Sequence, residues 1–119
     1  MRTLTIRILT EEATMQDIQQ KFTNTWKNDE YTGEYLTFES PNALFKAITP
    51  KCWELIDKLQ NLGTVSMREL ARQLGRDIHR IHDDIKKLKE LGIVEQNNKG
   101  VHVPFQKIHT DFTLKAKAA

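Results

Sequence analysis

Residues 66–94, SMRELARQLGRDIHRIHDDIKKLKELGIV, constrain the fold most, because they hold two short amphipathic helix patterns separated by one glycine. Ser66 is a predicted N-cap, and Glu69 stands at the spacing that completes a capping box with it. Apolar residues then recur at helical spacing on the first helix: Met67, Leu70, Ala71 and Leu74. Gly75 follows at once, and glycine adopts the left-handed conformation of a helix stop at little cost. The first helix is therefore short and ends at a tight turn.

Asp77 is the predicted N-cap of a second helix, which ends at Gly92. Its predicted buried stripe is Ile78, Ile81, Ile85, Leu88 and Leu91. The opposite stripe is polar and contains His79, Arg80, Asp83, Lys86, Lys87 and Glu90, with Arg76 directed toward the same N-terminal end. Two helices joined in this way predict a helix-turn-helix, whose second helix is free to enter a DNA major groove. An ordinary solvated charged face is the alternative interpretation.

After the second helix, the sequence pattern changes from helical spacing to short β-prone runs. Residues 93–96 and 101–105 are β-prone, and the intervening Asn97, Asn98, Lys99 and Gly100 suit a hairpin connection. A hairpin at this position would be a wing, with Lys99 at its tip near a phosphate. The predicted DNA-contacting residues are Arg76, His79, Arg80, Asp83 and Lys86 for the major groove, and Lys87 and Lys99 for phosphates.

Composition and charge fit this interpretation. The 119-residue chain carries a formal net charge of +2, but residues 1–49 are net −2 and residues 50–107 are net +3. Cys52 is the only cysteine, so an internal disulfide is impossible and a cytoplasmic location is expected. The sequence contains no apolar run long enough for a membrane span and no start typical of a secretory signal. The basic half of the chain is the half that holds the helix-turn-helix pattern.

No catalytic motif is present in the sequence, which lacks a glycine-rich phosphate loop, a nucleophile elbow and a paired-carboxylate pattern. His79 and His82 diverge by about 60° around their helix and have no cysteine nearby, which disfavours a metal site. We therefore expect no enzymatic activity, no metal and no cofactor.

The remaining segments predict an α+β fold. Residues 1–48 form an N-terminal β-α-β extension, with strands near residues 4–8 and 35–38 and a helix between them. Residues 49–114 form the winged helix-turn-helix domain with a C-terminal strand, and residues 115–119 are a tail. The extension is the expected dimerisation or partner segment.

Residues 50–105 resemble the winged helix-turn-helix regulators of the MarR-like and ArsR-like kind, through the words LARQLG and IHRIHDDIKKLKELGIV and the hairpin after them. The full chain is similar to small DNA-binding transcriptional regulators of bacteria and archaea, some of which resemble antitoxins. This resemblance implies dimeric operator binding with autoregulation. Arg76 departs from the pattern, because many such regulators have an apolar residue just after the turn glycine.

Three functions follow as hypotheses. The first is a homodimeric, sequence-specific regulator that binds double-stranded DNA and regulates its own gene, as a repressor or as an activator. The second, which can coexist with it, is an antitoxin whose N-terminal segment covers a toxin partner. RNA binding through the same face is the least favoured, because the major groove of an A-form helix is too narrow for a helix.

Overall fold

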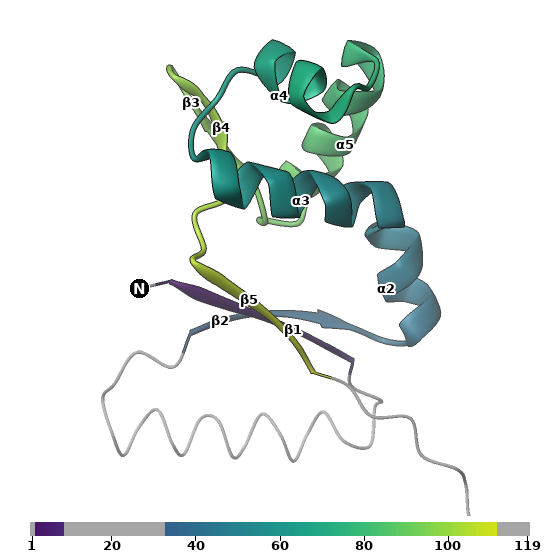
Figure 1. Ribbon diagram of the computed structural model, residues 1–119. Helices are drawn as coiled ribbons and strands as arrows, with labels where there is room; N and C mark the ends of the chain where they lie inside the picture. Colours follow the sequence, from purple (N-terminus) through teal and green to yellow (C-terminus); the bar gives the residue numbers. More distant parts are fainter. Residues whose placement is uncertain (1, 9–32, 112–119) are drawn as a thin grey trace, which may run out of the picture. The chain divides into compact units, whose positions relative to one another are not determined.

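A computed structural model describes residues 2–8 and 33–111 of the chain. These residues form an α+β structure with four helices and five strands (Figure 1). They divide into two units. We call Arg2 with Phe45–Gln106 the helical unit, and the described residues of Thr3–Leu44 with those from Lys107 onward the sheet unit. The helix predicted between residues 8 and 35 and the predicted tail lie outside the described residues.

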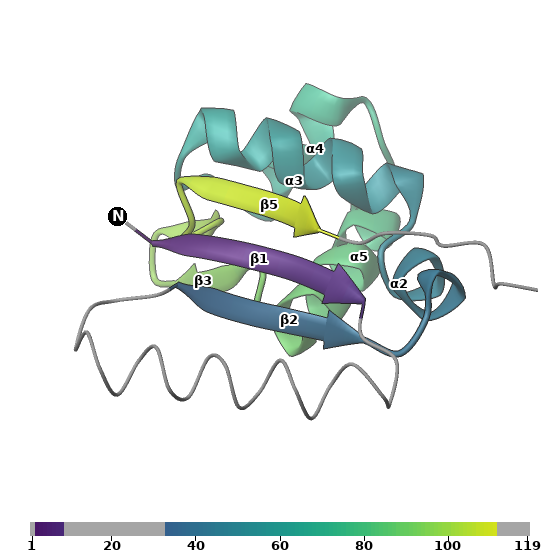
Figure 2. The ribbon, with the colours of Figure 1, turned by 90° about the horizontal axis from the view of Figure 1, so that it is seen from below.

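The sheet unit contains three parallel strands, β1 (Thr3–Ile8), β2 (Glu34–Phe38) and β5 (Lys107–Asp111). β1 lies in the middle, in the order β2-β1-β5, and all three arrows run the same way in Figure 2. Leu4 and Ile6 are buried on alternate positions of β1, as the period-two pattern predicts. Both predicted N-terminal strands and the C-terminal strand are thus confirmed, although β5 ends at Asp111, before Leu114.

Helix α2 (Pro41–Ala47) begins with a proline at its first position, and Ser40 Oγ accepts a hydrogen bond from Ala43 N. The spacing of Leu44, Phe45 and Ile48 in the sequence predicts that all three are buried; Leu44 and Ile48 are, but Phe45 is 55% exposed. The reason is geometric, because Phe45 follows Leu44 by about 100° and so leaves the narrow buried stripe of a two-turn helix.

The helical unit contains α3 (Pro50–Leu62), α4 (Met67–Leu74), α5 (Ile78–Glu90) and a hairpin of β3 (Glu95–Asn97) and β4 (Gly100–His102). α4 contacts both α3 and α5. The hairpin stands beside the segment that joins α3 to α4 (Figure 1), where Val65 forms a bridge with Val101. The buried apolar residues of this unit are Ile48, Cys52, Leu55, Ile56, Leu59, Leu70, Ala71, Ile81, Ile85, Leu88, Ile93, Val94, Val101 and Phe105.

The hairpin is shorter than predicted. β4 stops two residues before Pro104, since proline has no N–H to extend the ladder. At the turn, Asn97 Oδ1 accepts from Lys99 N at 2.8 Å. Gly100 is required by close packing, because a Cβ there would lie 2.2 Å from the Val65 carbonyl oxygen. The hairpin is therefore locked to the α3–α4 connection by its backbone.

Arg2 ties the hairpin to the start of the chain within this unit. Its carbonyl accepts from Gln106 N, and its guanidinium lies 4.8 Å from the centre of the Phe105 ring. The same guanidinium is 3.4 Å from Glu95 on β3. These contacts tie Arg2 both to the residues that follow β4 and to β3 of the hairpin.

Candidate nucleic-acid interface

Helix α5 is anchored on one side and open on the other. Ile81, Ile85 and Leu88 are 0% exposed, so one helical stripe is entirely buried. The other side carries exposed polar residues: His79, Arg80, His82, Asp83, Lys86, Lys89 and Glu90. A buried stripe fixes the helix in position and register, and the polar groups on the open face are consequently presented on a rigid element.

The turn before α5 forms as its residues predict. Ser66 caps α4 by accepting from Glu69 N, and Asp77 caps α5 by accepting from His79 N at 2.7 Å. Gly75 adopts the left-handed conformation at φ 63°, and Arg76 N bonds back to the Ala71 carbonyl. Only two residues, Arg76 and Asp77, separate Gly75 from the first residue of α5, and they set the angle at which α5 leaves α4.

The predicted capping box is only half formed. The Glu69 carboxylate accepts from Arg72 Nε at 2.9 Å and from Gln73 Nε2 at 3.0 Å, on the outer face of α4. The hydrogen bonds from Arg72 and then Gln73 lower the pKa of Glu69 to about 2. The side chain of Glu69, the third residue of α4, therefore pairs along the helix instead of reaching back to the cap.

Arg76 lies apart from the other predicted contact residues. Its side chain is only 12% exposed, and Nη2 donates to Asp84 Oδ2 at 2.7 Å. The Nε and Nη1 atoms of Arg76 are buried and have no hydrogen-bond partner among the described residues. This pair joins the turn to the middle of α5, so Arg76 fixes the turn and is not presented on the open face.

Lys87 also has a partner. It is half-buried, and its Nζ lies 3.4 Å from the carbonyl oxygen of Lys46, close to the end of α2. A helix carboxyl end attracts a cation, which accounts for this position. Lys99, by contrast, is exposed at the tip of the hairpin. The two predicted phosphate-binding lysines therefore occupy different environments.

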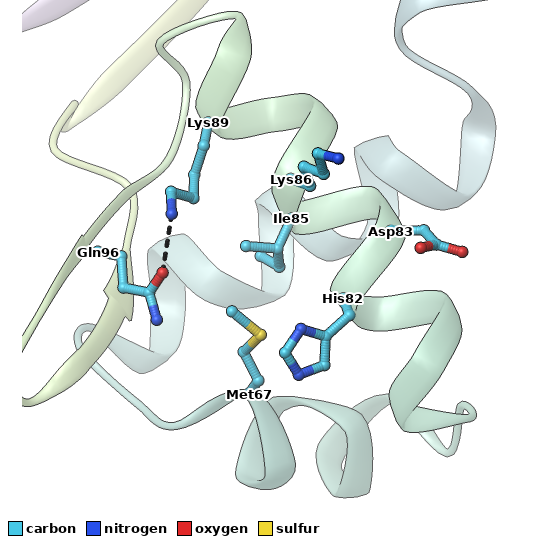
Figure 3. A pocket seen from close by; sticks show the side chains of 7 residues that line it. All are labelled: Met67, His82, Asp83, Ile85, Lys86, Lys89 and Gln96. Carbon is cyan, nitrogen blue, oxygen red and sulfur yellow. Dashed lines mark hydrogen bonds between the residues drawn. The ribbon is translucent and has the colours of Figure 1, made fainter.

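A hollow of about 400 Å³ lies between α4, α5 and β3. Its lining residues are Met67, His82, Asp83, Ile85, Lys86, Lys89 and Gln96 (Figure 3). Lys89 Nζ donates to Gln96 Oε1 at 2.8 Å across it. His82 points toward Met67, whereas the carboxylate of Asp83 points away from both (Figure 3). The hollow has an apolar floor and a mainly basic rim.

A family model, HVO_A0114, matches residues 47–110 of the chain. The chain belongs to the HVO_A0114 family. The match begins at the last residue of α2 and includes α3, α4, α5, the hairpin and all but the last residue of β5. No curated protein and no solved structure matches the chain. All elements of the candidate interface thus lie inside the region that defines the HVO_A0114 family.

Three residues of this HVO_A0114 interface, His82, Lys89 and Gln96, were not among the predicted contact residues. His82 and Lys89 are one helical position away from the buried Ile81 and Leu88, so periodicity alone assigns them to the flank of the helix. Gln96 reaches α5 only through the fold of the hairpin. The basic composition of residues 86–89 is the one sequence signal that includes Lys89.

The described part of the HVO_A0114 chain shows no grouping of three or more His, Cys, Asp or Glu residues that could hold a metal ion. Cys52 is a buried free thiol. Among the described residues, no helix is long and apolar enough to cross a membrane.

Proposed function

We propose that the chain is a sequence-specific, double-stranded DNA-binding transcriptional regulator, with a winged helix-turn-helix of the MarR-like or ArsR-like kind formed by α3, α4, α5 and the β3–β4 hairpin. The observation that carries this proposal is the geometry of α5, with its apolar stripe buried and its polar stripe exposed along 13 residues. An α-helix presented in this way fits the width of the B-DNA major groove.

The proposed base contacts come from the exposed face of α5, through His79, Arg80, Asp83 and Lys86. Arg and Lys donate to guanine, and a carboxylate such as Asp83 accepts from a cytosine amine or orients a neighbouring base-reading side chain. Lys99 binds a phosphate from the tip of the hairpin, and Lys87 does so by exchanging its weak contact with Lys46. Arg76 is a positioning residue that acts through Asp84.

Homodimerisation is part of the same proposal. One helix contacts only a few base pairs, and useful specificity needs two half-sites one or more helical turns apart. Residues 1–48 and the C-terminal strand are the proposed dimer surface, and its described elements are β1, β2, α2 and β5. Two copies of α5 would then read a two-fold symmetric operator, with autoregulation as the proposed use.

A gel-shift titration of the full chain against the DNA upstream of its own gene tests this function. We expect tighter binding to that DNA than to a random duplex at physiological salt, together with a strong dependence on salt. Lys86→Glu should abolish the preference, because it places a carboxylate on the exposed face of α5. Lys51→Glu reverses an equal charge on α3, where a helix start tolerates an acid, and should leave binding nearly unchanged. Equal binding of upstream and random DNA would refute the function.

A further inference from the structure

We infer that the hollow between α5 and the hairpin binds one phosphodiester of the DNA backbone, with Lys89 as its principal contact. This inference rests on the proposed DNA-binding function and adds Lys89 and Gln96, which were not among the predicted contact residues, to the interface. The hollow lies between α5 and the hairpin, since five of its lining residues belong to α5, Gln96 comes from β3, and Met67 begins α4.

The pairing of Lys89 with Gln96 prepares the site for an anion. Lys89 uses one N–H in its 2.8 Å bond to Gln96 Oε1, so two further N–H groups of the ammonium are available. Because Oε1 of Gln96 accepts this bond, its amide NH₂ group has two donors for the same anion. A lysine held by a neutral partner keeps its full positive charge, which a carboxylate partner would neutralise.

The remaining lining selects for a phosphate that carries an organic group. Met67 and Ile85 supply an apolar surface beside the cations, and a deoxyribose offers a matching apolar surface. His82 adds a polar group at the rim beside Met67, whereas the ammonium of Lys86 points away from Lys89 and Gln96 (Figure 3). The carboxylate of Asp83 would repel an anion, but it points away from Lys89 and Gln96 (Figure 3). The chemistry therefore favours a sugar-phosphate chain over a bare inorganic anion.

The position of the hollow beside α5 explains why the bound anion would be a phosphate of duplex DNA. A helix seated in the major groove is flanked by the two phosphate chains, and contacts to them fix its register without reading sequence. The hollow lies on the flank of α5 that faces the hairpin, next to the exposed residues proposed to read bases. When α5 occupies the major groove, the DNA phosphate chain that borders the groove passes between α5 and β3.

The test compares Lys89→Gln with Lys51→Gln, a matched loss of one exposed lysine on a helix that does not line the hollow. Binding of the full chain to a random-sequence duplex is measured from about 50 to about 200 mM salt. We expect Lys89→Gln to weaken binding at the lowest salt and to reduce the slope of log K against log salt by about one, whereas Lys51→Gln keeps the wild-type slope. Circular dichroism melts of both variants verify that they fold.

Two results separate this inference from the function on which it rests. If the wild-type chain binds duplex DNA and Lys86→Glu weakens that binding, but Lys89→Gln keeps the wild-type slope, the phosphate site is refuted and the function stands. If the wild-type chain binds no duplex, both fail. A titration with inorganic phosphate alone tests whether the hollow binds free phosphate instead of the DNA backbone. Loss of phosphate binding in Lys89→Gln with an unchanged DNA slope would also overturn the assignment to the backbone.

Discussion

At the scale of single residues, Asp83 and Asp84 show how neighbouring identical side chains acquire different tasks. Asp84 pairs with the largely buried guanidinium of Arg76 at 2.7 Å, whereas Asp83 is exposed on α5. Two consecutive acids are unusual on a helix that approaches DNA, and the ion pair accounts for one of them. Of these two acids, only Asp83 then adds negative charge to the proposed DNA-binding face.

This difference predicts the stability of two isosteric variants. Asp84→Asn should lower the free energy of unfolding by about 2 kcal/mol, because it leaves the Arg76 charge largely buried without its ionic partner. Asp83→Asn should change it by less than about 0.5 kcal/mol, as is usual for an exposed substitution. Urea denaturation measures both. Equal effects of the two variants would mean that the Arg76–Asp84 pair does not stabilise the turn.

At the scale of elements, the two helices could be predicted because their signals are local. Ser66, Gly75 and Asp77 each act on the backbone within a few residues, and all three cap or stop the helices where expected. The spacing of apolar residues likewise identified the buried stripe of α5, with Ile81, Ile85 and Leu88 fully buried. Local chemistry was sufficient for α4, the turn and α5.

Contacts between elements could not be predicted in the same way. Arg76 meets Asp84 eight residues away across a turn, and Lys89 meets Gln96 only because the hairpin folds back beside α5. Each pair joins residues outside one common helix or strand, so no periodicity within an element indicated it. The seven predicted contact residues could therefore be named from the sequence, but the partners of Arg76 and Lys87 and the hollow beside Lys89 required the fold.

Helix α4 should lose stability in acid because of Glu69. The hydrogen bond from Arg72 is the main cause that lowers the Glu69 pKa from 4.5 to about 2 in the folded chain. Since the folded pKa lies below the unfolded one, the carboxylate favours folding above pH 4.5, and this contribution is lost as the pH falls toward 2. The wild-type advantage over Glu69→Gln should thus be constant near neutral pH and shrink below pH 4.5.

Urea denaturation of both proteins over a series of pH values measures this difference. Arg72→Gln removes the arginine that pairs with Glu69. The difference in free energy of unfolding between the wild type and Arg72→Gln should therefore depend on pH in the same way. A wild-type advantage that is equal at neutral and acidic pH would contradict the assigned role of the Glu69 carboxylate.

At the scale of the whole chain, charge and family membership both single out the same region. Residues 50–107 are net +3 while residues 1–49 are net −2, and the HVO_A0114 match at residues 47–110 covers nearly the same stretch as the basic part. A positively charged segment of this kind supports the proposed contact of residues 50–107 with DNA. The alternative role of residues 1–48 as a toxin-binding segment stays a prediction from the sequence.

The most direct test of the central proposal places a DNA-cleaving group on α5. Cys52 is the only cysteine and is 0% exposed, so His79→Cys provides a unique accessible thiol for an attached iron chelate. The same group on Glu54→Cys, an exposed position of α3, is the control. With DNA from upstream of its own gene, we predict that the group at residue 79 cuts a few adjacent base pairs in each of two symmetric half-sites, and that the group at residue 54 cuts little. Retained binding with no focused cutting from residue 79 would show that α5 does not face the DNA.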